Sequence, residues 1–236
     1  MTTGYTAFKD RKKVQFIMEA LDQAGARRVL EVGCGSGNVA EAMIAAGKEV
    51  VALDVDLASL QHAGERSRAR LVAGDAMALP VRGPFDAVVC SEVLEHLGRP
   101  EAALREIRAI LRPGGRLVIT VPNGYGPYEV TNHVLEWVGV RELLKRVVLT
   151  PTEQERRRRE STYNAHTPHE QYFTMPRLQA LVRSAGFSIQ RVGHSDFMSW
   201  VPYVRHLEPI ARLDCALADR LPGAVVSGVL LDAAVA

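Results

Sequence analysis

The sequence contains little of what marks secreted or membrane-spanning proteins. Only three cysteines occur among 236 residues, and their odd number and wide spacing argue against a disulfide framework and favour a reducing cytoplasm. No run of about 18 apolar residues is present, so we expect no membrane-spanning helix. The stretch Met1 to Asp10 is polar and does not resemble a signal peptide. The formal net charge is +2, so any electrostatic preference for nucleic acid has to be local.

Short apolar runs alternate with amphipathic stretches, the pattern of a parallel sheet covered by helices. The predicted strands are 28–32, 49–53, 71–73, 85–90, 116–121 and 187–192, with a last, antiparallel strand at 224–233. The predicted helices are 14–24, 39–46, 57–68, a short one from Glu92, 100–111, 175–185 and 203–220. We therefore expect an α/β fold, a doubly wound Rossmann-like sheet of seven strands with helices on both faces.

The alternation stops after the fifth predicted strand. We interpret 123–168 as an inserted lid or acceptor-binding segment within a single domain spanning 1–236. Its 130–149 part has the apolar spacing of an amphipathic helix, and an arginine run follows at 156–159. Three roles are open for this segment. It packs on the domain with a solvated charged face, it contacts an anionic membrane through 130–160, or it contacts RNA phosphates. The near-neutral total charge disfavours RNA. Four aromatic residues here are candidates to line an acceptor pocket: Tyr125, Tyr128, Trp137 and Tyr163.

A glycine-rich turn follows the first predicted strand, at Gly33, Gly35 and Gly37, and Glu31 precedes it. Glycine lets the backbone approach a ligand closely, because no Cβ intervenes. A dinucleotide site would have the spacing Gly-x-Gly-x-x-Gly, which this turn lacks. A glycine turn that merely joins a strand to a helix is the alternative.

Acidic residues follow the next two predicted strands. Asp54 lies about 20 residues beyond the loop, where a carboxylate can accept both hydroxyls of a ribose; its alternative role is a helix cap, which Asp56 could fill instead. Asp75 can accept a hydrogen bond from an exocyclic amine, and Met77 can pack on a purine face. Cys34 and Cys90 are expected to pack beside a bound cofactor rather than act as nucleophiles.

These segments, with Phe85–Cys90 and the Pro113-Gly114-Gly115 turn, resemble the ordered motifs of class I S-adenosylmethionine-dependent methyltransferases. The resemblance covers about residues 25 to 122 closely and 166 to 192 more loosely. It implies that the 33–37 loop holds the methionine end of S-adenosylmethionine, Asp54 the ribose, and Asp75 with Met77 the adenine. It also implies a seven-stranded sheet whose last strand is antiparallel, and S-adenosylhomocysteine as the product.

After the fourth predicted strand, Glu92, Glu95 and His96 would share one face of a helix. Two carboxylates and an imidazole on one face are a plausible half-site for a divalent cation such as Mg²⁺. With a later histidine, His169 or its competitor His166, the pattern resembles magnesium-dependent O-methyltransferases of two groups, which methylate polyprenyl catechols in ubiquinone synthesis or the 3′-terminal ribose of small RNAs. Alternatively, the tripeptide Leu94-Glu95-His96 serves only to position the helix or the cofactor.

A cation there would lower the pKa of a chelated hydroxyl and orient its oxygen. Without a metal, His169 or His96 is the candidate general base, because imidazole titrates near neutral pH. We therefore expect O-methylation of a small hydrophobic catechol-like or diol-like metabolite by an enzyme of the cytoplasm or the membrane surface. The alternatives are RNA ribose 2′-O-methylation, N- or C-methylation of a small molecule, and a non-catalytic cofactor-binding subunit.

Overall fold

The computed structural model describes residues 8–126, 130, 134, 137–139, 169–197 and 208–236. Most of the segment 123–168 lies outside the described residues, as do His166, Tyr128, Tyr163 and the arginine run at 156–159. Within the described part, no helix is both long and apolar enough to cross a bilayer.

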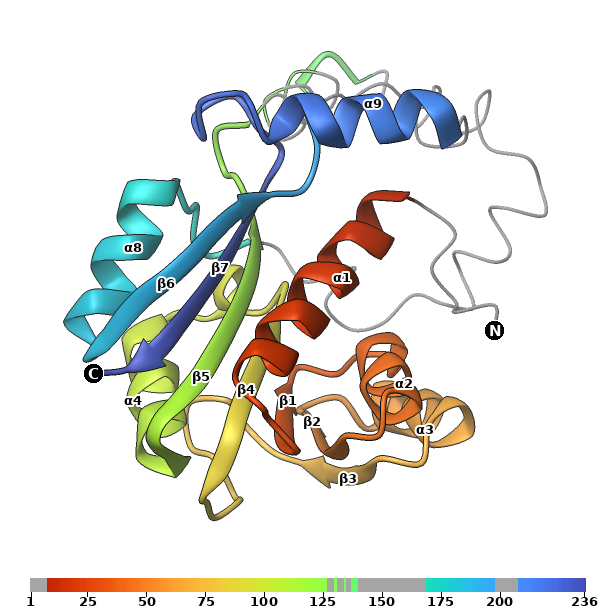
Figure 1. Cartoon of the computed structure of the whole chain (residues 1–236), viewed down its shortest axis with the longest axis vertical. Coiled ribbons are helices and arrows are strands. Elements are labelled where there is room, and N and C mark those ends of the chain that lie inside the picture. The colour runs from red at the N-terminus through yellow and green to blue at the C-terminus, as the bar shows by residue number, and fades with distance from the viewer. Residues whose placement is uncertain (1–7, 127–129, 131–133, 135–136, 140–168, 198–207) are drawn as a thin grey trace.

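The described chain forms one seven-stranded sheet in the order β3-β2-β1-β4-β5-β7-β6 (Figure 1). The strands are β1 (Arg28–Val32), β2 (Glu49–Asp54), β3 (Arg70–Ala73), β4 (Phe85–Ser91), β5 (Leu111–Pro122), β6 (Phe187–His194) and β7 (Gly228–Val235). The first five strands are parallel to one another, whereas β7 pairs antiparallel with both β5 and β6. The predicted Rossmann-like topology with an antiparallel last strand is confirmed.

Helices cover both faces of the sheet, and strand residues alternate between two cores. The helices are α1 (Phe8–Gln23), α2 (Asn38–Ala45), α3 (Leu57–Arg66), α4 (Pro100–Ile110), α8 (Met175–Ser184) and α9 (Glu208–Ala218). On β1, Val29 belongs to the core under α1, α2 and α3, and Leu30 to the core under α4 and α8. Because β1, β2 and β4 are parallel, their carboxyl ends lie at the same edge of the sheet, and helices pack on both faces of that sheet.

Two local predictions differ from the structure. The expected helix from Glu92 is only a 3₁₀ turn, Leu94–His96, preceded by the left-handed residue Glu92. The Pro113-Gly114-Gly115 turn lies inside β5, where the pairing with β4 shifts register between Phe85 and Ala87. The turn is therefore an irregularity within the strand and not a boundary before it.

Candidate functional site

The glycine loop between β1 and α2 has a backbone that side chains would block. Gly33, Gly35 and Gly37 have φ values of 70°, 50° and 77°, in the left-handed region. A Cβ on Gly33 would lie 2.3 Å from Cγ2 of Val93, and one on Gly37 would lie 2.9 Å from the Cα of Ala63. The loop therefore requires glycine on steric as well as conformational grounds.

Asp54 ends β2 directly beside this loop. Its Oδ2 accepts a hydrogen bond from the Gly35 amide at 2.8 Å, and its Oδ1 accepts one from the Asp56 amide at 2.9 Å. Asp56 caps α3, because its Oδ2 accepts hydrogen bonds from the amide and hydroxyl of Ser59. The capping role thus belongs to Asp56, and the Asp54 carboxylate binds the glycine loop through the Gly35 amide.

Glu31 carries a buried carboxylate at the carboxyl end of β1, with 2% of the residue exposed. Its Oε2 has no hydrogen-bond partner among the described residues. Burial, and then the nearby Asp54 carboxylate, raise the pKa of Glu31 well above its usual value. A buried carboxylate oxygen without a hydrogen-bond partner is stabilised most by a ligand that brings positive charge or hydrogen-bond donors.

The remaining predicted cofactor residues lie in two different surroundings. Asp75 is exposed and its Oδ1 accepts a hydrogen bond from the Met77 amide at 2.8 Å, while Met77 packs on the core under α4. Cys90 is fully buried in that same core, and burial, then Glu95, raise the pKa of its thiol. Burial likewise raises the pKa of Cys34. Both thiols stay protonated at neutral pH, which agrees with the expectation that neither is a nucleophile.

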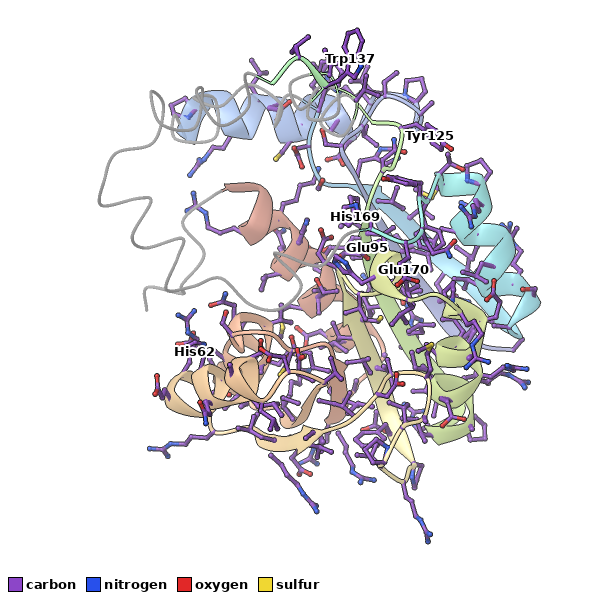
Figure 2. The ribbon with its side chains drawn as sticks, turned by 180° about the vertical axis from the view of Figure 1, so that it is seen from behind. His62, Glu95, Tyr125, Trp137, His169 and Glu170 are labelled. Atoms are coloured by element: carbon purple, nitrogen blue, oxygen red, sulfur yellow. The ribbon has the colours of Figure 1, made fainter. Side chains whose placement is uncertain are left out.

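A second group of side chains lies beyond β4. Ligand atoms of Glu95, His96 and His169 all lie within 4.8 Å of one another. The two imidazole rings have centroids 5.1 Å apart, and His96 Nε2 is 3.9 Å from Glu95 Oε1. Glu95 is 2% exposed, and Figure 2 shows it beside His169 at the centre of the molecule. One carboxylate and two imidazoles from distant parts of the chain therefore converge.

Backbone hydrogen bonds bring His169 to this place. The amides of Glu170 and Gln171 both donate to the Glu95 carbonyl, at 2.8 and 2.9 Å. Farther along, the Gly124 amide donates to the Phe173 carbonyl at 2.9 Å, and Asn123 forms a parallel bridge with Phe173. The segment 169–174 is thus fixed at two points, across the 3₁₀ turn and the end of β5.

Glu92 is not among the three residues whose ligand atoms lie within 4.8 Å of one another, and the predicted helix face shared with Glu95 and His96 is wrong. The 3₁₀ turn starts only at Leu94, and Glu92 has a φ of 57°. Its Oε1 accepts a hydrogen bond from the Thr120 hydroxyl at 2.9 Å and lies 3.0 Å from Nζ of Lys13 on α1. No sequence signal indicates Lys13, because one lysine on an amphipathic helix is unremarkable.

Comparison with known proteins identifies the chain's relatives. Residues 5–192 match the family described as "Methyltransferase domain". A ubiquinone biosynthesis O-methyltransferase of Xanthomonas axonopodis pv. citri is 36% identical over 118 residues, covering 47% of this chain and 49% of that protein. A demethylmenaquinone methyltransferase of Renibacterium salmoninarum is 38% identical over 112 residues, covering 46% and 47%. The matched region spans about half the length of these relatives.

Solved structures share the fold at low sequence identity. Magnesium protoporphyrin IX methyltransferase from Synechocystis PCC 6803 with bound SAH superposes with a TM-score of 0.61 at 16% identity, covering 97% of this chain and 84% of that one. An S-adenosylmethionine-dependent methyltransferase from Clostridium acetobutylicum gives 0.62 at 12% identity, covering 95% and 91%. Sheet order, glycine loop and family match agree, and the chain belongs to the Rossmann-like family of S-adenosylmethionine-dependent methyltransferases.

Proposed function

We propose that the protein transfers a methyl group to a hydroxyl of a small hydrophobic acceptor with a catechol-like or diol-like pair of oxygens. The observation that carries this proposal is the convergence of Glu95, His96 and His169 just beyond β4, at the sheet edge where the glycine loop follows β1. The O-methyltransferase name of a relative that is 36% identical supports the same acceptor class.

The cofactor half of the site consists of residues at the ends of β1, β2 and β3. S-adenosylmethionine supplies an electrophilic methyl group when bound. We assign its methionine end to the 33–37 loop, with Glu31 compensating positive charge, and its ribose to Asp54. Asp75 and Met77 would hold the adenine. The buried Oε2 of Glu31 has no partner among the described residues, and side chains would block the 33–37 loop. Both features suit a cationic ligand that lies against the backbone.

We assign Glu95, His96 and His169 to a divalent cation. One carboxylate and two imidazoles suit Mn²⁺ or Fe²⁺ at least as well as Mg²⁺, whose preferred ligands are oxygens. A bound cation would lower the pKa of an acceptor hydroxyl. Without a cation, an imidazole of His96 or His169 would accept the hydroxyl proton, because the imidazole group is the side chain most suited to general base catalysis.

Metal dependence tests this assignment. With a catechol acceptor, excess EDTA should lower turnover at least about tenfold, and Mg²⁺ or Mn²⁺ should restore it. His169→Gln should cause a similar loss that added metal does not restore. The matched control is His62→Gln, on the exposed surface of α3 away from the cluster (Figure 2), and it should behave as wild type. Turnover unaffected by EDTA would remove the cation and leave the histidines as candidate bases.

We also propose that 123–168 forms the acceptor-binding insertion of a single domain and touches a membrane surface through 130–160. Four apolar residues with helical spacing, Val130, Val134, Trp137 and Val138, are at least half exposed. Trp137 and Tyr125 lie at the same end of the molecule, beyond His169 (Figure 2). Sedimentation with anionic vesicles should capture the wild type more than Trp137→Ser.

A gel shift with short RNA at physiological salt would favour ribose methylation instead.

A further inference from the structure

Glu92 has a backbone conformation that calls for a cause. Among the described residues it is the only one other than glycine with a positive φ, 57°, and it directly follows β4. Such a conformation costs free energy for a residue with a side chain, and it persists where the surroundings fix it. The contacts of Glu92 therefore indicate what holds the bend.

Three elements meet at Glu92. Its amide donates to the Thr120 carbonyl at 2.8 Å, and its Oε1 accepts from the Thr120 hydroxyl at 2.9 Å. Thr120 is fully buried on β5, and its hydroxyl also lies 2.8 Å from that of Ser91. Because the Thr120 proton is used on Glu92, Ser91 must donate to Thr120. Lys13 reaches the same Oε1 from α1, at 3.0 Å.

The residues after the bend serve both halves of the site. Val93 packs where a Cβ on Gly33 would lie, only 2.3 Å from it, so it is in direct contact with the cofactor loop. The 3₁₀ turn Leu94–His96 follows immediately and carries Glu95 and His96 of the cluster. The direction of the chain at Glu92 thus determines how the cluster lies relative to the loop.

We propose that Glu92 is a positioning residue, whose carboxylate, held by Lys13 and Thr120, fixes the spacing between the cofactor loop and the Glu95–His96–His169 cluster. This inference rests on the proposed function. It gives α1 a part in the reaction, because Lys13 ties that helix to the end of β4. It also gives Glu92 a role different from the metal ligand expected from its sequence spacing.

Steady-state kinetics and calorimetry on single variants test the proposal. Lys13→Ala and Glu92→Gln should each lower kcat about tenfold or more, because small displacements of reacting groups are costly. The affinity for S-adenosylmethionine should stay within about threefold, since the residues of the 33–37 loop are unchanged. Lys13→Arg should recover most of kcat. The matched control is Lys12→Ala, because Lys12 instead contacts Asp219 and the Cys215 carbonyl. Wild-type kcat in Lys13→Ala would overturn the proposal.

A second variant separates the carboxylate from the backbone. Glu92→Gly adopts a positive φ at little cost and keeps the amide bond to the Thr120 carbonyl, but it has no carboxylate to contact Lys13 or the Thr120 hydroxyl. It should fold, bind S-adenosylmethionine and show the same low kcat as Glu92→Gln. Full activity in Glu92→Gly would show that the bend does not need the carboxylate, and this would overturn the proposal.

A third measurement works even if no methyl transfer is found. The ring ¹H–¹⁵N signals of His96 and His169, recorded by NMR without any metal, should move in Lys13→Ala and not in Lys12→Ala. A shift in an enzyme without O-methyltransferase activity would count against the proposed function alone. If Lys13→Ala leaves the ring signals unchanged, the positioning role is overturned. Unchanged signals are the result expected if Glu92 acts only as a metal ligand.

Discussion

Two acids with different surroundings, Glu31 and Asp54, lie at the carboxyl ends of the neighbouring strands β1 and β2. Asp54 is engaged by two backbone amides, whereas Glu31 has an oxygen with no partner among the described residues. Because the pKa of Glu31 is raised in the folded chain, its contribution to stability is full below the unfolded pKa and is lost as pH rises through the folded pKa. A cationic ligand offsets that loss by binding the ionised form.

Replacing this acid should separate stability from binding. Glu31→Gln removes the charge that burial and Asp54 disfavour, so the ligand-free variant should melt no lower than wild type at pH 8. Its S-adenosylmethionine affinity should fall at least about tenfold, because a charge-assisted contact is lost. Calorimetry should also show wild-type affinity rising from pH 5 to pH 8, and this slope should be smaller in Glu31→Gln. Glu49→Gln, at the exposed start of β2, is the control. Wild-type affinity in Glu31→Gln would contradict the assignment.

At the scale of elements, apolar periodicity predicted the strands and most helices, because each buries a continuous face that the sequence displays directly. The glycine loop was predictable for a different reason, because the positive φ values of its backbone are a local requirement for glycine. The bend at Glu92 was not, because its contacts are with Lys13 and Thr120, which are distant in sequence. Nor could the sequence show that Glu170 and Gln171 bind the Glu95 carbonyl. Local patterns predicted what each residue type can do, and long-range contacts decided which residues meet.

The contact between β5 and the segment 169–174 has a sharp test at Gly124. A Cβ there would lie 2.6 Å from Cβ and 2.9 Å from Cα of Tyr172, both in a segment fixed by backbone bonds. Gly124→Ala should therefore displace His169 and lower kcat about tenfold, with little change in S-adenosylmethionine affinity. The control is Gly64→Ala on α3, where alanine suits a helix and meets only the movable end of Leu71. Equal kinetics in both variants would contradict this account of the site.

At the scale of the whole molecule, the reversed strand β7 joins the parallel part of the sheet to β6. Arg116 on β5 forms a two-point ion pair with Asp232 on β7, and Asp232 is fully buried. A buried pair contributes little compared with an apolar pair, but removing one partner leaves a costly charge.

Asp232→Ala should therefore lower the free energy of unfolding by about 3–5 kcal/mol, measured by urea titration. The double variant Arg116→Met with Asp232→Leu should recover most of that loss, because no buried charge is left without a counter-ion. If the single and double variants are equally unstable, packing rather than charge determines the effect.

The two attachments of the segment 169–174 are made by main-chain atoms. The residues proposed to hold the cofactor lie within 31–77, whereas His169 belongs to the segment 169–174, which backbone bonds attach to Glu95 and to Gly124. If the acceptor and the cofactor are bound as proposed, exchange of the stretch between β5 and α8 would alter which acceptor is methylated and leave the residues proposed to hold the cofactor unchanged. Docking through main-chain atoms makes such exchange tolerant of sequence, because almost any residue offers the same amide.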